Sequence, residues 1–188
     1  MATIETPRLY LRRLQPTDMD AYYQRIYADP DVMRTLLARA PISRAEFEAR
    51  IPTVMITHWH THGFGPWVVI YKPDNQLIGH CGLRYWPESS DIEVLYALDK
   101  CYWGKGLATE GARASLRYGF EQLRLERIVA AALVDNQASR RVLEKIGMRY
   151  EQDFQFHGFD VASYGLSRAD YQADDTLYRL IVADAQSR

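Results

Sequence analysis

Apolar and polar residues alternate with two different periods along this chain, and each period predicts a different kind of element. A period of two residues predicts half-exposed strands over 8–14 and 91–99, and two more within 149–168 on either side of His157-Gly158. Two β-rich runs flank a turn at residues 73–75 and predict a hairpin over 65–86. Residues 127–134, "RIVAAALV", are apolar after the first position, which is typical of a buried central strand.

A period near 3.6 residues predicts four helices, over 16–29, 43–63, 107–122 and 136–147. Ser43 is placed to cap the second helix, and Glu46 three positions later completes a capping box. Pro52 lies inside this helix and is expected to kink it or split it in two. Asn136 and Gly147 are residue types that begin and end helices, as the fourth helix requires. We expect the last residues of the chain to form a frayed helix.

The predicted elements follow the order β-α-α-β-β-β-α-β-α-β-β. This order indicates an α+β fold, a mixed sheet with helices packed on its faces. The strand at 91–99 has two different faces. Its alternation places Ile92, Val94, Tyr96 and Leu98 on one face, and Glu93, Leu95 and Ala97 on the other.

The composition narrows the class of protein. The 188 residues suit a single domain over 1–188, and 47% apolar with 25% charged residues is typical of a globular protein. Lys and Arg number 23 against 24 Asp and Glu, and this near-neutral balance argues against a nucleic-acid or acidic-membrane surface. The apolar runs are too short to span a bilayer, and the N-terminus does not have the pattern of a signal peptide. We therefore expect a cytoplasmic protein.

The stretch "YWGKGLATEG" (102–111) joins a predicted strand to a predicted helix and carries very little side chain. Gly104, Gly106 and Ala108 leave the start of the helix open, while Lys105 adds a positive charge and Thr109 a hydroxyl. Main-chain N–H groups at a helix start have no partner inside the helix, so this arrangement suits a di-anion such as a pyrophosphate. A tight turn that needs glycine only for its geometry explains the two glycines equally well.

Two segments together carry a resemblance to a known family. The run "LYALDKCYWGKGLATEGARASLRYGF" is followed by a strand and then by "DNQASRRVLEKIGM". In this order they resemble the acyl-CoA-binding core of the GNAT superfamily of N-acetyltransferases, whose pyrophosphate turn reads [QR]xxGx[GA]. Gly106 and Ala108 fit this pattern, whereas Trp103 replaces the Gln or Arg. With "TPRLYLRRLQPTD" near the N-terminus, the chain resembles the branch that acetylates ribosomal-protein N-termini and small amines, from Thr6 to about Arg168.

The resemblance implies a central mixed, mostly antiparallel sheet of six to seven strands, with helices on both faces. Two parallel strands, here 91–99 and 128–134, would splay apart and hold the pantetheine arm of acetyl-CoA. The cofactor contacts it implies are the main chain at Leu98, the turn residues Trp103, Gly104, Lys105, Gly106, Ala108 and Thr109, and the side chain of Asn136. Asn136 is equally well explained as a helix cap, and one residue can do both.

Acetyl transfer needs a neutral amine, a stabilised oxyanion and a protonated leaving thiolate. Glu93 is our candidate base, because it lies on the strand that meets the cofactor. The alternatives are a surface carboxylate on the strand and an ion pair with Arg84 on the neighbouring strand. The family's usual acid, a Tyr seven residues after the Asn, is Leu143 here, so the resemblance points to Ser139 instead. Ser139 is otherwise an ordinary helix serine, and Tyr96 and Tyr150 stay open as acids.

Two further groups of charged or titratable residues have simpler explanations. His58, His60 and His62 in "HWHTHG" lack an accompanying carboxylate or cysteine at ligand spacing, so we expect no metal site and assign them to a helix end. By resemblance they lie near the acceptor mouth. Glu110, Arg113 and Arg117 are interpreted as a solvated helix face.

We therefore expect an acetyl-CoA-dependent N-acetyltransferase acting on a primary amine, either an N-terminal α-amine or a small molecule. The alternatives are a catalytically silent acyl-CoA-binding or protein-interaction module of the same fold, and a nucleotide-binding protein that uses the same glycine turn. No stretch of the sequence identifies the acceptor. A homodimer is compatible with such families, but no residue pattern establishes one.

Overall fold

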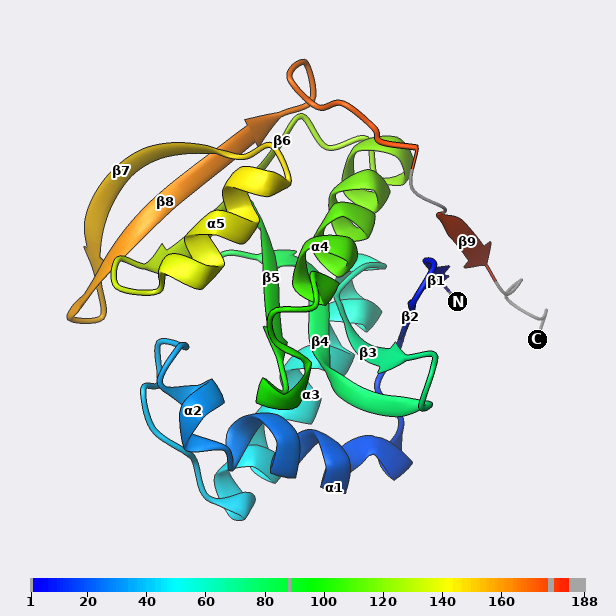
Figure 1. The fold of residues 1–188 in the computed structure, drawn as a ribbon, viewed down its shortest axis with the longest axis vertical. Coiled ribbons are helices and arrows are strands. Elements are labelled where there is room, and N and C mark those ends of the chain that lie inside the picture. The colour runs from blue at the N-terminus through cyan, green and yellow to red at the C-terminus, as the bar shows by residue number, and fades with distance from the viewer. Residues whose placement is uncertain (1, 88, 176–177, 183–188) are drawn as a thin grey trace.

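The computed structural model describes residues 2–87, 89–175 and 178–182, and in them one sheet forms the centre of the molecule (Figure 1). Its nine strands lie in the order β7-β8-β6-β5-β4-β3-β2-β1-β9. The strands are β1 (Ala2–Glu5), β2 (Leu9–Arg12), β3 (Pro66–Tyr71), β4 (Gln76–Tyr85), β5 (Ile92–Leu98), β6 (Arg127–Leu133), β7 (Arg149–Phe156), β8 (Phe159–Ser167) and β9 (Arg179–Val182). The predicted mixed α/β fold is confirmed.

Every pair of neighbouring strands is antiparallel except β5 and β6, which are parallel. The parallel register holds at one position, Glu93 opposite Val129. The two strands do not pair beyond it, as the resemblance implied. The sheet is therefore two antiparallel halves that meet at a short parallel contact.

The sheet has nine strands, two to three more than the six to seven we expected. β1 was missed because it is only four residues long, although its Ile4 is fully buried. β9 corrects the expectation of a frayed C-terminal helix for residues 179–182, which pair antiparallel with β1; residues 183–188 lie outside the described part of the chain. β9 is the edge strand and pairs with β1 at the other end of the chain, so local periodicity could not reveal it.

The helices are α1 (Met19–Tyr22), α2 (Pro30–Met33), α3 (Arg44–His62), α4 (Leu107–Arg117) and α5 (Gln137–Lys145). α4 and α5 pack on one face of the sheet, and α1, α2 and α3 gather toward its other face (Figure 1). Among the described residues, no helix has both the length and the apolar character needed to cross a membrane.

The helices differ from the predicted ones in two places. The helix predicted over 16–29 is a series of short turns around α1. Asp29, where we expected the helix to end, is the N-cap of α2, because its carboxylate accepts from the N–H groups of Asp31 and Val32. Pro52 does not split α3, which runs unbroken from Arg44 to His62. Pro52 is buried, and the packed face of the helix offsets the hydrogen bond that proline removes.

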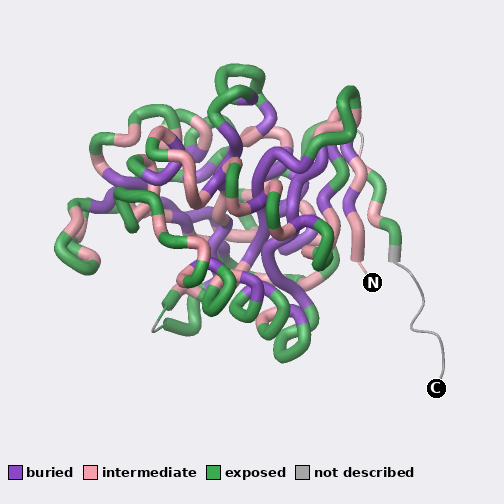
Figure 2. Tube along the Cα trace, turned by 90° about the horizontal axis from the view of Figure 1, so that it is seen from below, coloured by how far each residue is buried: buried purple, intermediate pink, exposed green. Residues whose placement is uncertain are grey.

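The core has two parts, one on each face of the sheet, and the strand alternation separates them. Ile92, Val94 and Leu98 of β5 pack with α4 and α5, whereas Ala97 packs with the cluster that holds α1 and α3. Figure 2 shows the buried segments running through the middle of the molecule, with exposed turns at its periphery. Residues 91–99 therefore present one face to each half of the core, as predicted.

A glycine allows β4 and β5 to approach closely where β5 ends. Gly79 has φ +144°, and a Cβ there would lie 2.1 Å from the Ala97 carbonyl oxygen. The register between β3 and β4 shifts at the same place, between Val69 and Ile70. A side chain at Gly79 would therefore push away the end of β5, which carries several candidate site residues.

Candidate active site

The gap between β5 and β6 leaves main-chain groups without a sheet partner. Asp91 and Asp99 bond to β4, the first through its carbonyl and the second through its N–H, so the odd-numbered residues of β5 face that strand. Alternation then turns the N–H and C=O groups of Tyr96 and Leu98 toward β6. The ladder to β6 holds only at Glu93, so these groups face the gap and can bind a ligand's amide or carbonyl groups.

The start of α4 lies directly after β5 and is as bare as the sequence predicts. Gly106 occupies the cap position with φ +76°, and no side chain caps the helix there. Gly104 also has positive φ, at +74°, and a Cβ added to it would meet nothing within 4 Å. The first-turn N–H groups up to Thr109 therefore have no acceptor inside the helix and point toward an exposed loop. The positive end of the helix dipole adds to their attraction for an anion.

Trp103 and Lys105, on either side of Gly104, are both fixed by contacts with neighbouring residues. The indole Nε1 of Trp103 donates to the Leu98 carbonyl oxygen at 2.6 Å, which ties the loop to the end of β5. The Lys105 ammonium lies 4.8 Å from the centre of the Tyr102 ring. The carbonyl of Leu98 is thus occupied by the loop, which leaves its N–H as the group that faces the gap.

Arg8 and Glu110 anchor this loop, and the sequence did not identify either residue in that role. Arg8 donates through Nη1 to the Lys105 carbonyl at 2.9 Å and through Nε to Glu110 at 2.7 Å. The Thr6 hydroxyl donates to the other Glu110 oxygen at 2.6 Å. The Glu110 side chain is 8% exposed, so the expectation of a solvated face is wrong for this residue. No local pattern could show this, because about a hundred residues separate the partners.

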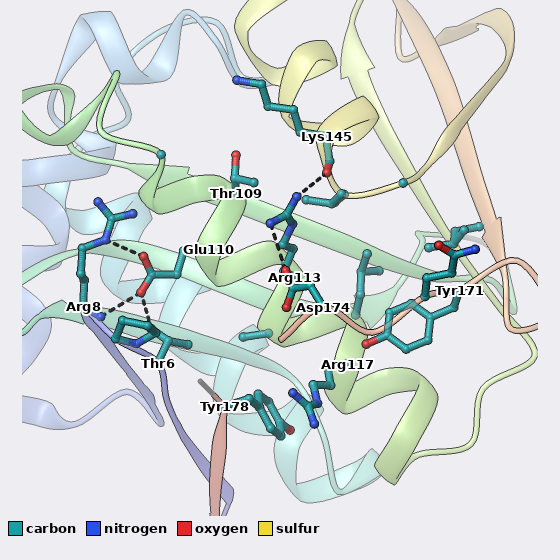
Figure 3. A pocket seen from close by; sticks show the side chains of 18 of the residues that line it. Thr6, Arg8, Thr109, Glu110, Arg113, Arg117, Lys145, Tyr171, Asp174 and Tyr178 are labelled. Atoms are coloured by element: carbon teal, nitrogen blue, oxygen red, sulfur yellow. Dashed lines mark hydrogen bonds and ion pairs between the residues drawn. The ribbon is translucent and has the colours of Figure 1, made fainter. Parts of the chain in front are cut away.

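A cavity of about 550 Å³ runs along the outer side of α4 (Figure 3). It extends from Gly106 and Thr109 to Arg117, and Tyr171 and Tyr178 line its other side. Arg113 crosses it and donates to Asp174 at 3.0 Å and to the Lys145 carbonyl at 2.9 Å. The cavity therefore adjoins the glycine loop but lies apart from the gap between β5 and β6.

α5 contributes two of the predicted site residues, and both are hydrogen-bonded. The Asn136 side chain accepts from the Ser139 N–H at 3.0 Å and donates to the Thr35 carbonyl at 3.3 Å. Its role as a helix cap is therefore confirmed. The Ser139 hydroxyl lies 2.9 Å from the Tyr96 hydroxyl, and Tyr96 also donates to the Ser139 carbonyl at 3.1 Å. This pair connects β5 to α5, and burial raises the pKa of Tyr96 well above its usual value.

Glu93 lies on the opposite face of β5 from Tyr96. It is 4% exposed, and its Oε1 accepts from Arg84 Nε at 2.6 Å. The ion pair with Arg84, which was the alternative prediction for Glu93, is therefore present. Burial raises the pKa of Glu93, although the charge of Arg84 and their hydrogen bond act in the other direction. A buried carboxylate with a raised pKa and one engaged oxygen has the properties of a proton acceptor.

The fold, the splayed parallel pair and the bare helix start together define an acyl-group-transferring class of protein, and comparison with known proteins identifies the family. The sequence profile of the acetyltransferase (GNAT) domain matches residues 8–149, so the chain belongs to this family and is an acetyltransferase. It is 31% identical to the uncharacterized N-acetyltransferase p20 of Bacillus licheniformis, over 80% of this chain and 84% of that protein.

Two solved structures share the fold. A GNAT-family acetyltransferase from Bacillus anthracis is 27% identical, with a TM-score of 0.75 over 89% of this chain and 99% of that one. A ribosomal L7/L12 alpha-N-protein acetyltransferase in complex with coenzyme A is 20% identical, with a TM-score of 0.72 over 90% of this chain and 97% of that one. The second likeness establishes the shared architecture alone.

Proposed function

We propose that this protein transfers the acetyl group of acetyl-CoA to a primary amine by direct attack of the amine on the thioester. The observation that carries the proposal is the unpaired main-chain edge of β5 leading directly into the uncapped start of α4. The edge supplies donors for an extended arm at Tyr96 and Leu98, and the helix start supplies donors for a di-anion. The extended arm corresponds to the pantetheine of coenzyme A, and the di-anion corresponds to its pyrophosphate.

The cofactor contacts we propose follow the chain from the strand to the helix. The Leu98 N–H bonds the arm near the thioester, and the N–H groups between Trp103 and Thr109 hold the pyrophosphate, with Lys105 adding charge. Acetyl-CoA supplies the activated acetyl carbon, and the protein supplies the groups that bind it and transfer protons. Gly104, Gly106 and Ala108 keep the approach open. Asn136 shapes the start of α5 and contacts the arm only through its exposed edge.

Glu93 and Ser139 move the protons in this proposal. Glu93 takes a proton from the incoming amine, while the C–N bond forms and the C–S bond breaks. Ser139 donates its hydroxyl proton to the departing sulfur and receives one from Tyr96, whose hydroxyl lies 2.9 Å away. Water returns the proton to Tyr96, and Glu93 releases the proton of the amine to water, so both groups are restored. The two groups lie on opposite faces of β5, so the amine and the sulfur are served from opposite sides of the thioester in the gap.

The acceptor we propose is a primary amine that is neutral when it attacks, either an N-terminal α-amine or an amine on a small molecule. The solved structure bound to coenzyme A is described as a ribosomal L7/L12 alpha-N-protein acetyltransferase, an enzyme whose acceptor is of the first kind. We propose a cytoplasmic location and no metal requirement. The single domain needs no nucleic acid or membrane for the reaction, and a homodimer is compatible with it.

The test replaces the base and measures transfer and binding separately. Glu93→Gln keeps the size of the side chain and a hydrogen bond to Arg84, and we expect kcat/KM to fall by about 10²–10⁴ in a thiol-release assay with a panel of amines. Coenzyme A affinity in calorimetry should stay within about twofold. Glu126→Gln, which alters an exposed ion pair with Arg168, is the matched control and should change neither quantity.

Two results would decide against parts of this proposal. If coenzyme A binds but no amine releases thiol, the silent acyl-CoA-binding module becomes the correct reading. If ATP or NAD competes with coenzyme A as well as coenzyme A itself does, the glycine turn is a general nucleotide site.

A further inference from the structure

His58, on the last turns of α3, bridges this helix to the end of β4. Its Nδ1 lies 2.7 Å from the Phe64 carbonyl oxygen, and its Nε2 lies 3.0 Å from the main-chain nitrogen of Tyr85. A carbonyl only accepts and a main-chain N–H only donates, so Nδ1 must carry a proton and Nε2 must not. The two contacts together therefore define one neutral tautomer of His58.

The contact with Tyr85 replaces a missing piece of sheet. β3 pairs with β4 as far as Pro66 opposite Gly82, so Tyr85 lies beyond the last partner on that side. Trp86, directly after β4, donates its N–H to the carbonyl of Asp91, directly before β5. By alternation the Tyr85 N–H then points away from β5, toward the side on which β3 has ended. His58 supplies the acceptor that the strand no longer offers.

Tyr85 directly follows Arg84, the residue that pairs with Glu93. Holding the main chain at Tyr85 fixes the end of β4, and that fixes the point from which the Arg84 side chain reaches the carboxylate. The rings of His62, Phe64 and Tyr85 surround the imidazole, with centroids at 4.6, 5.0 and 5.8 Å. The half-buried imidazole therefore packs among aromatic rings, and its contact with Tyr85 lies one residue from the ion pair between Arg84 and the proposed base Glu93.

We propose that neutral His58 is a positioning residue, which holds the end of β4 so that Arg84 is aligned on Glu93, and that its protonation releases this alignment at acid pH. The inference rests on the proposed role of Glu93. An imidazolium would set an N–H against the Tyr85 N–H, two donors facing each other, and the contact would be lost. The motif "HWHTHG" thus acquires a role that is neither metal binding nor a simple helix-end charge.

The surroundings of His58 favour its neutral form. Burial lowers its pKa, and the nearby His62 and Arg84 lower it further, whereas the bond to the Phe64 carbonyl acts in the opposite direction. Because the pKa of His58 is depressed in the folded state, the contact with Tyr85 stabilises that state fully at pH values above the unfolded-state pKa of histidine, about 6.5. Its contribution is lost as the pH falls from there through the folded value.

The experiment measures the contact and the reaction independently. Nuclear magnetic resonance of the full chain should show His58 as the Nδ1–H tautomer at pH 8, and the Tyr85 amide should lose at least about tenfold in exchange protection as His58 titrates. His58→Gln offers a carbonyl acceptor that does not titrate, so its Tyr85 amide should stay protected throughout. His60→Gln, an exposed position two residues away on α3, is the matched control and should behave as the wild type does.

The pH profile then connects the contact to catalysis. His58→Gln should retain kcat/KM within about threefold at pH 8 and lose the acid limb that follows the His58 titration, whereas His60→Gln keeps it. An Nε2–H tautomer, or a Tyr85 amide indifferent to the titration, would overturn the contact. An unchanged acid limb in His58→Gln would overturn the positioning role. If no amine is acetylated, the proposed function fails, and the resonance measurements still decide the tautomer and the amide contact.

Discussion

Helices α4 and α5 begin at the same edge of the sheet, after the neighbouring parallel strands β5 and β6, yet their first turns are built in opposite ways. α5 is capped by its own residue, because Asn136 accepts from the Ser139 N–H. α4 starts at Gly106, where no side chain caps it. A helix start satisfied by its own side chain needs no ligand, whereas one left open by glycine is available to one. The difference separates a structural helix start from a binding one.

The sharpest way to break this comparison is to close the open helix start. Gly106→Asp adds a carboxylate where the pyrophosphate is proposed to lie, and coenzyme A affinity should fall by about ten- to a hundredfold through charge repulsion. Positive φ costs about 1–2 kcal/mol of stability as well. Gly158→Asp has the same backbone strain at φ +82°, far along the chain in the β7–β8 turn, and should leave affinity unchanged in calorimetry.

A smaller effect should follow from loosening the loop that leads to the open start. Arg8→Met removes the bonds to the Lys105 carbonyl and to Glu110, so we expect coenzyme A to bind about three- to tenfold more weakly, with a shallower dependence on salt. Arg12→Met is the matched control, because it breaks a comparable ion pair, with Asp18, at the other end of β2 and away from the loop. Equal losses in both variants would show that the anchor is merely structural.

The smallest effect on affinity is expected at the capped helix. Asn136→Ala should cost about 0.5–2 kcal/mol in the free energy of unfolding, measured by urea denaturation, while coenzyme A affinity changes less than twofold. Ser43→Ala, which removes the cap that accepts from Glu46 at 3.2 Å on α3, should give a similar loss of stability. If Asn136→Ala weakens coenzyme A as strongly as Gly106→Asp, then α5 is also a binding helix and the distinction between the two starts disappears.

What could be predicted from sequence is what depends on near neighbours. The caps at Ser43 and Asn136, and the two faces of the strand at 91–99, follow from contacts within a few residues. The order of the larger strands and helices followed in the same way. These features are confirmed because the same local hydrogen bonds and periodicities operate in the folded protein.

What could not be predicted depends on partners brought together only by folding. Thr6 and Arg8 reach Glu110 across about a hundred residues, and this turned an apparently solvated glutamate into a buried one. The hydroxyl of Tyr96 meets Ser139 only because α5 packs over the end of β5. Pro52 carried a local signal that the burial of α3 overrode. In each case the decisive energy is tertiary, and it leaves no periodic trace in the sequence.

The single matched position between β5 and β6 has a mechanical consequence. Glu93 and Val129 form the only rung of the ladder between the two antiparallel halves in the part of the chain that the structure describes. A ligand bound in the gap between β5 and β6 would bond to both strands, and it would thereby join the two halves of the sheet and reduce their motion relative to each other. Larger side chains along this gap would wedge the halves apart without touching any group that handles protons.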